Sequence, residues 1–378
     1  MTCPLPLDAL PKPLHKHVDP KAPPALRMMG AKGLVPAVAA PDLAVMLFFL
    51  SFDEDPGVRE AAARTAAGLP DRIFGVALRA EGLPGPVLDW LSRELGANEG
   101  ALELVLLNPA TSDETVARLA AEVSQRLTEI VRQNELRLLR HDEIIRQLCR
   151  NPNALASTVD GACDFCVRNG LTLLDVPQLV AAHRRVHGVD PAAAEPQDTA
   201  TGLLGEYGHV LAEEEPAAPA GPPRPEDPAK AAEKLNITQR ILKMSVSQKI
   251  KLATLGNKEA RTILLRDSNK LVCMAAATSP RITDLEILGL ANSRTVNADV
   301  LRYVYTNREF LRTYPIKLAL VKNPKVPLPT ALKMLFSLQE KDIKELSRDR
   351  NVPQTIQSQA KAFLMKKEQA ARATEGKH

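Results

Sequence analysis

Apolar residues recur three and four positions apart along most of this 378-residue chain. That spacing places them on one face of a helix, whereas the strict alternation typical of half-buried strands is not sustained over consecutive segments. Polar turns with Asn, Ser, Asp or Pro interrupt the pattern and supply helix start signals. The pattern predicts an all-α protein.

Local signals predict where some of these helices start and end. Asp42 and Ser112 are candidate N-caps, and Ser245 or Ser247 can cap a helix that ends at Gly256. Residues 123–148 are long enough for one extended helix or for two helices joined near Asn134.

One turn pattern recurs four times in the C-terminal third, at residues 278–283, 292–297, 322–327 and 348–353. Each copy has a polar turn, a basic or small residue, one β-branched aliphatic residue, and then a capping residue or proline. Helical spacing of apolar residues follows each copy. Short turn-and-helix segments cannot bury their apolar faces alone, so they must stack on one another. We therefore expect an α-solenoid-like architecture.

Changes in composition divide the chain into five parts. Two α-solenoid-like helical-repeat domains, residues 41–188 and 236–368, carry the helical pattern. A disordered, acidic Pro/Ala/Glu-rich linker is predicted between them at 189–235. Residues 1–40 are a Pro-rich arm, either disordered or strapped along the first helices, and 369–378 form a tail. Residues 203–211 inside the linker are more apolar, which indicates a short docking segment or a chance apolar patch.

Two short motifs carry a resemblance to known families. The run Asp-Glu-Asp-Pro-Gly-Val-Arg-Glu-Ala-Ala-Ala at 53–63 resembles the HEAT-repeat motif. The Asn-Pro turns at 108–109, 151–152 and 323–324 resemble those of leucine-rich-repeat-variant proteins and related bacterial helical solenoids. The HEAT resemblance implies that Val58 fills the core and that Arg59 pairs with an acidic residue of a neighbouring turn. Both resemblances imply a fold class and no activity.

Composition limits the kind of core and the compartment. Apolar residues make up 45% of the chain but aromatic residues only 3%, so Leu, Ala, Val and Ile must build the cores. Five scattered cysteines do not suggest a secreted disulfide framework, and they favour the reducing cytoplasm. The most apolar run, at 43–50, is too short to span a bilayer and is expected to form a buried helix. The Ala/Pro/Arg-rich N-terminal half suggests a bacterial origin.

One constellation has the spacing of a metal site. Cys163 and Cys166 are followed, after sixteen intervening residues, by His183 and His187. This is close to a Cys-x2-Cys…His-x3-His zinc pattern, and it is also compatible with ordinary helix residues that share a face. A redox role for the Cys-x-x-Cys pair would need a βαβ context, which the sequence lacks.

Signatures of catalysis are missing from the sequence. There is no Gly-x-Ser-x-Gly motif and no phosphate-binding glycine loop. The acidic run at 53–55 is the usual composition of a helix start. We therefore expect no enzymatic activity, no cofactor and no small-molecule substrate.

Charge is distributed unevenly. Residues 1–190 carry 20 basic and 24 acidic side chains, residues 191–230 carry 2 and 8, and residues 231–378 carry 27 and 13. Stacked turns would align four basic residues of the C-terminal part on one edge: Arg281, Arg294, Lys325 and Arg350. Such a ridge attracts an acidic protein surface, nucleic acid or the chain's own acidic linker.

The predicted function is that of a non-enzymatic, protein-binding adaptor or regulatory scaffold whose basic C-terminal domain engages an acidic partner. A nucleic-acid-binding helical-repeat protein is the first alternative. A zinc- or thiol-dependent enzyme or sensor that uses Cys163 and Cys166 is the second.

Overall fold

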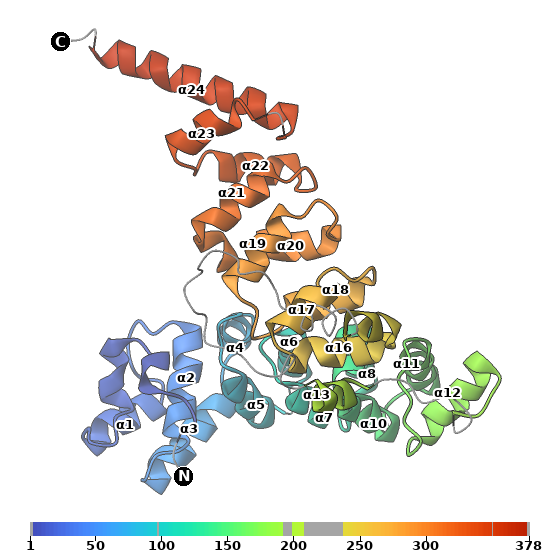
Figure 1. Ribbon diagram of the computed structural model, residues 1–378. Coiled ribbons are helices and arrows are strands. Elements are labelled where there is room, and N and C mark those ends of the chain that lie inside the picture. Colours follow the sequence, from blue (N-terminus) through green and yellow to red (C-terminus); the bar gives the residue numbers. More distant parts are fainter. Residues whose placement is uncertain (1–2, 97, 192–198, 208–236, 350, 376–378) are drawn as a thin grey trace. The chain divides into compact units, whose positions relative to one another are not determined.

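The computed structural model describes residues 3–96, 98–191, 199–207, 237–349 and 351–375. These residues form α-helices and short 3-10 helices joined by turns, and none of them lies in a strand, which confirms the all-α prediction (Figure 1). Contacts within the chain group into two compact units. The N-terminal unit comprises residues 1–168 and 172–194, and the C-terminal unit comprises 169–171 and 195–378. No helix among the described residues is long and apolar enough to cross a membrane.

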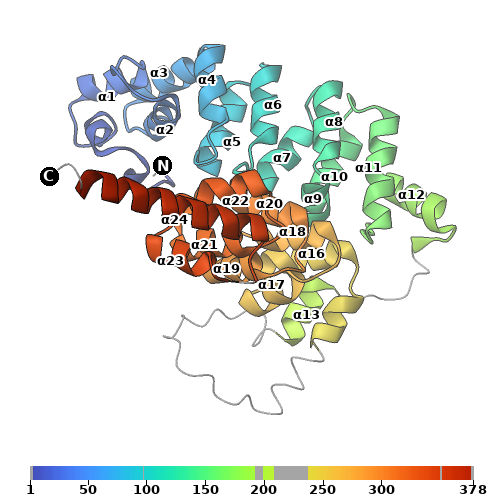
Figure 2. The ribbon, with the colours of Figure 1, turned by 90° about the horizontal axis from the view of Figure 1, so that it is seen from above.

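The N-terminal unit is a series of short helices. They are η1 (Leu7–Ala9), η2 (Lys12–His17), α1 (Pro24–Ala31), α2 (Ala40–Leu50), α3 (Pro56–Ala67), α4 (Asp71–Leu78), α5 (Gly85–Glu94), α6 (Glu99–Leu107), α7 (Asp113–Ala120), α8 (Gln125–Gln133), α9 (Glu135–Arg140), α10 (Asp142–Arg150), α11 (Ala156–Arg168) and α12 (Pro177–His187). Helices α2, α4, α6, α8 and α11 each pack against the next of this series, and Figure 2 shows α4, α6, α8 and α11 side by side.

Local sequence signals explain where these helices start, with two corrections. Ser112 caps α7 as predicted, since its hydroxyl accepts a hydrogen bond from Thr115 N. Asp42 was expected to cap α2, but the helix begins at Ala40 with Pro41 in its first turn, so Asp42 is already helical. Of the two alternatives for residues 123–148, the break near Asn134 is the one observed, and a second break at His141, which the pattern did not predict, separates α9 from α10.

The C-terminal unit is also a series of short helices. They are α13 (Ala200–Glu206), α16 (Val246–Leu255), α17 (Lys258–Leu264), α18 (Lys270–Ala277), α19 (Asp284–Asn292), α20 (Ala298–Thr306), η4 (Phe310–Arg312), α21 (Tyr314–Lys322), α22 (Leu328–Leu335), α23 (Glu340–Leu346) and α24 (Gln354–Glu375). Helix α13 lies within the predicted linker. Its Ala200 and Leu203 are buried, and it packs against α16. Residues 189–191 and 199–207 of the predicted linker are described, whereas 192–198 and 208–235 are outside the described residues.

Three Asn-Pro turns hold neighbouring turns together by the same contacts. Asn108, Asn151 and Asn323 are buried, and each side-chain amide donates to two backbone carbonyls about thirty residues earlier in the chain. The acceptors are Leu78 and Ala80, Ala120 and Val123, and Ala291 and Ser293. Each Oδ1 also accepts from the backbone N–H two residues ahead. We call these three residues the Asn clamps.

Aspartate takes the same turn position elsewhere and contacts a basic side chain instead. Asp53 and Asp267 also accept a hydrogen bond from the backbone N–H two residues ahead. Asp53 pairs with Arg27, and Asp267 pairs with Lys249 Nζ at 2.8 Å. A carboxylate has no N–H to donate to a carbonyl, so it needs a cation as partner.

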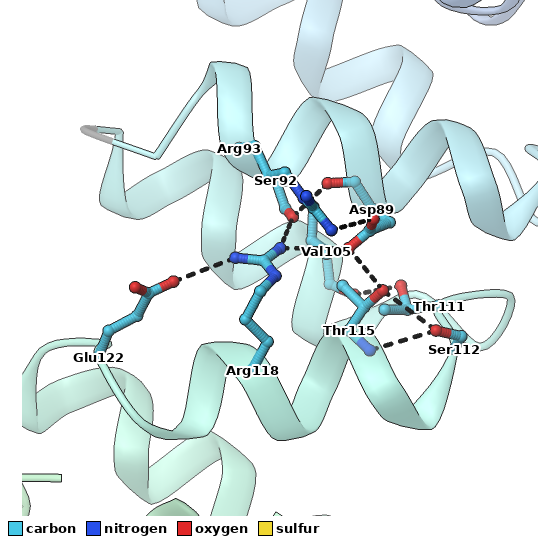
Figure 3. A network of polar contacts seen from close by, with 9 residues as sticks. All are labelled: Asp89, Ser92, Arg93, Val105, Thr111, Ser112, Thr115, Arg118 and Glu122. Atoms are coloured by element: carbon cyan, nitrogen blue, oxygen red, sulfur yellow. Dashed lines mark hydrogen bonds and ion pairs between the residues drawn. The ribbon is translucent and has the colours of Figure 1, made fainter. Parts of the chain in front are cut away.

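A network of polar side chains joins helices α5 and α7 (Figure 3). Arg118 of α7 donates to Ser92 Oγ and, at 3.3 Å, to Asp89 Oδ1, both on α5. Asp89 also accepts from Thr115 Oγ1 at 3.0 Å. These hydrogen bonds join the two helices, so we assign the network to helix packing.

The HEAT-like segment begins as expected but uses its arginine differently. Asp55 caps α3, and Val58 is fully buried, as the resemblance implies. Arg59 Nη1 donates to the backbone carbonyls of Asp53 and Glu54, at 2.6 and 3.0 Å, in the turn before its own helix. No bond from Arg59 to an acidic side chain of a neighbouring turn is present in the described chain.

Candidate functional site: a groove beside α19

A groove of about 660 Å³ lies in the C-terminal unit beside α19. It is lined by residues of α17, the α17–α18 turn, α18, α19 and the α19–α20 turn: Lys258, Thr262, Leu265, Arg266, Asp267, Ser268, Cys273, Leu285, Glu286, Gly289, Leu290, Ser293, Thr295, Val296 and Asn297. The hollows beside Leu69 and Pro152 are smaller, at about 460 and 570 Å³.

One wall of the groove is a face of α19 that is apolar and open. Leu285 is 68% exposed, although exposure of a large aliphatic side chain to water is unfavourable. Gly289, one helical turn later on the same face, would place a Cβ in open space, with no heavy atom within 4 Å. Glycine inside a helix costs about 1 kcal/mol relative to alanine. Gly289 makes no close packing contact in the described chain that would require glycine, whereas a groove that must stay open would favour it.

Glu286, which lines the groove, belongs to a buried ion pair. Arg261 of α17 is 1% exposed and lies 3.0 Å, through Nε, from Glu286 Oε1 of α19. Glu286 also accepts from Thr283 N at 2.9 Å and from its hydroxyl at 2.7 Å, which completes a capping box at the start of α19. This carboxylate is therefore fully engaged in holding α19 to α17.

The charges that remain free at the groove are positive. Its second carboxylate, Asp267, is paired with Lys249. Lys258 and Arg266 line the groove, are exposed, and have no ion-pair partner among the described residues. With both acids neutralised and two cations unpaired, the groove presents an apolar wall and a positive rim.

The only thiol that lines this groove is unreactive. Cys273 Sγ donates to Asp267 O at 2.8 Å. Burial, together with the negative charge of Asp267, raises the pKa of Cys273 to about 11. The thiol therefore stays protonated at neutral pH and is a poor nucleophile.

The structure brings together part of the predicted basic ridge. Lys325 Nζ donates to Val296 O at 2.8 Å, and Arg294 Nη2 donates to Asn351 O at 3.1 Å. The turns at 293–297, 323–327 and 351–353 therefore lie close together. Both cations are engaged with backbone carbonyls, so they help to hold these turns together. Arg350 is outside the described residues.

Arg281 does not share this edge. It precedes α19, whereas Arg294 follows it, so a nine-residue helix separates their turns. The Asp284 carboxylate beside it accepts from Thr313 Oγ1 at 2.9 Å, which places this end of α19 next to the start of α21. The recurring turns look alike in sequence, so the pattern did not show that the turn of Arg281 lies before α19 and the turn of Arg294 after it.

The four candidate zinc ligands make other contacts. Cys163 and Cys166 are fully buried in α11, and Cys163 Sγ lies 3.7 Å from Cys149 Sγ. His183 Nδ1 donates to Val189 O at 3.0 Å, and its ring lies tilted against that of His187, with 4.7 Å between the centroids. No group of three or more His, Cys, Asp or Glu side chains that could hold a metal ion occurs in the described parts of the chain.

Sequence reasoning missed the groove, although one signal was present. Gly289 interrupts an otherwise good helix pattern, four residues after Leu285. An isolated glycine in a helix often has a packing or functional reason. Comparison of this chain with protein-family models, curated proteins and solved structures finds no match.

Proposed function

We propose that this protein is a non-enzymatic adaptor whose C-terminal unit binds an acidic segment of a partner protein. The segment carries apolar side chains that enter the groove beside α19 and carboxylates that meet Lys258 and Arg266. In this proposal the two units are α-solenoid-like repeat domains. Support for that architecture comes from the Asn clamps, which recur in both units and each reach back about thirty residues.

The observation that carries the proposal is the combination of Gly289 and the free cations. A glycine that touches nothing keeps an apolar wall accessible, and every carboxylate that lines the groove is already paired. An acidic, leucine-bearing helix or strand matches both properties. The groove has no feature that suggests catalysis, since its thiol is protonated and its carboxylates are held in ion pairs.

The test uses a labelled peptide of glutamate and alanine that carries two leucines one helical turn apart. We expect full-length protein to bind it, by fluorescence anisotropy, with affinity that falls as salt rises. The double variant Lys258→Glu, Arg266→Glu should bind roughly tenfold more weakly or worse, because two attractions become repulsions. The same peptide with serine in place of leucine should also bind weakly.

The matched control is Lys333→Glu with Lys361→Glu, which changes the net charge equally at two exposed lysines that do not line the groove. Equal losses in both double variants would show that binding is only a response to net charge. Competition by duplex DNA as effective as by the peptide itself would favour a nucleic-acid partner instead.

A further inference from the structure

Two thiols of the N-terminal unit lie next to each other although thirteen residues separate them in sequence. Cys149 is in the last turn of α10, and Cys163 is in the middle of α11. Their sulfur atoms are 3.7 Å apart. Cys149 is half-buried and so open to small solutes, whereas Cys163 is fully buried.

The fold holds this pair within reach of a covalent bond. A disulfide needs a sulfur–sulfur distance of about 2.05 Å, so the two atoms must approach by less than about 2 Å. Rotation about a cysteine χ1 angle moves Sγ by such a distance without moving the backbone. The Asn clamp at Asn151 anchors the turn between the two helices to Ala120 O and Val123 O. The helix ends are therefore fixed while the side chains rotate.

The two thiols differ in reactivity. The hydrogen bond from Cys163 lowers the pKa of Cys149, and it outweighs burial and the nearby charge of Asp160, which raise it. The same hydrogen bond and burial raise the pKa of Cys163. The more exposed sulfur is therefore the one that ionises, which is the arrangement of an attacking thiolate beside a resolving thiol.

We propose that Cys149 and Cys163 are a redox-sensitive pair that a peroxide converts into a disulfide. In the first step the Cys149 thiolate attacks one peroxide oxygen, the O–O bond breaks, and Cys149 becomes a sulfenic acid while the other oxygen leaves as water after taking a proton. In the second step Cys163 sulfur attacks Cys149 sulfur, the S–O bond breaks, and a second water leaves with the Cys163 proton. Two thiols are oxidised and one peroxide is reduced.

The remaining described thiols lack these features. Cys3 is half-buried, and burial raises its pKa. Cys166 is fully buried, and burial raises its pKa strongly. Cys273 is in the other unit and donates to a backbone carbonyl. The reaction should therefore be selective for one pair of the five cysteines.

The experiment treats native full-length protein briefly with hydrogen peroxide, then blocks free thiols in denaturant and maps tryptic peptides. We expect the thiol titre to fall from five to three and peptide 147–150 to become joined to peptide 151–168. Because 151–168 holds both Cys163 and Cys166, the mapping is repeated in Cys166→Ser, where the joined peptide should persist. It should disappear in Cys163→Ser and in Cys149→Ser.

Fragmentation of the wild-type joined peptide by tandem mass spectrometry assigns the bond to Cys163 or to Cys166, so the wild-type result decides the matter even if a buried cysteine variant fails to fold. A joined peptide that reverts on reduction with dithiothreitol, in a monomeric product, supports the proposal. Oxidation of Cys149 to sulfinic acid without a joined peptide would overturn it. Loss of the joined peptide in Cys166→Ser would also overturn it, since the bond would then involve Cys166. The Cys273→Ser variant serves as the unaffected control.

Discussion

The turns before α19 and before α22 occupy the same place in the recurring pattern, but different side chains fasten them. Before α22, the Asn323 amide donates to Ala291 O and Ser293 O and closes the gap to the neighbouring turn. Before α19, that position is Ser279, which is buried and whose hydroxyl has no hydrogen-bond partner among the described residues. A serine side chain is one bond shorter and carries no amide.

The turn before α19 is held by the side chain of Glu286 instead, and a groove remains beside it. Glu286 fastens the turn through its bonds to Thr283 and reaches across to Arg261 of α17. The long arginine side chain spans the distance between the two helices, and the groove is lined by Glu286 at this junction. The comparison indicates that a buried Asn amide brings two neighbouring turns into direct contact. An ion pair formed by a long arginine side chain can instead join two helices and leave a groove beside them.

The largest loss of stability is expected when the ion pair between Arg261 and Glu286 is broken. Arg261→Met leaves the Glu286 carboxylate buried without its cation, which should cost about 3–5 kcal/mol of stability. The loss is measured by chemical denaturation and located by hydrogen exchange of the α17 and α19 amides. The exposed pair Lys270–Asp299 is the control, because Lys270→Met should cost no more than about 1 kcal/mol. Similar losses in the two variants would contradict this assignment.

A smaller loss of stability is expected when the Asn clamp at Asn323 is removed. Asn323→Ala removes the two hydrogen bonds that the amide donates to Ala291 O and Ser293 O and the one that Oδ1 accepts from Lys325 N, so we expect a loss of about 1–3 kcal/mol. Asn151→Ala removes the equivalent clamp of the N-terminal unit and should cost a similar amount. Hydrogen exchange should report each loss in its own unit. Unchanged protection of α19 and α21 in Asn323→Ala would show that the clamp contributes little.

The smallest effect, with the opposite sign, is expected at Ser279. Ser279→Ala removes a buried hydroxyl that has no partner, so stability should stay the same or rise by up to about 1 kcal/mol. Thermal unfolding is the measurement. A clear loss of stability would mean that Ser279 fastens its turn after all, and the contrast with Asn323 would fail.

Local features of the fold were readable from the sequence. The caps at Ser112 and Ser245, the end of α16 before Gly256, and the break at Asn134 all follow from short-range backbone chemistry. The Asn-Pro turns were visible as well. Their partners were not, since each lies about thirty residues away and depends on how the helices stack.

The candidate sites depend more strongly on packing, so less of them could be predicted. The ridge was inferred from similar turns, but Arg281 and Arg294 lie at opposite ends of α19. Zinc spacing drew attention to Cys163 and Cys166, whereas the actual neighbour of Cys163 is Cys149 on the preceding helix. The spacing of residues within one helix predicts which side chains share a face, but it does not predict which other helix packs against that face.

Gly289 offers the most direct test of the account, because substitutions there change the groove and little else. An added Cβ meets open space, so Gly289→Ala should fold, gain up to about 1 kcal/mol of stability, and bind the acidic leucine peptide as the wild type does. Gly289→Phe should also keep its helix content, yet its ring should fill the groove and weaken peptide binding at least tenfold. If the phenylalanine variant binds the peptide as tightly as the alanine variant, the groove beside α19 is not the binding site.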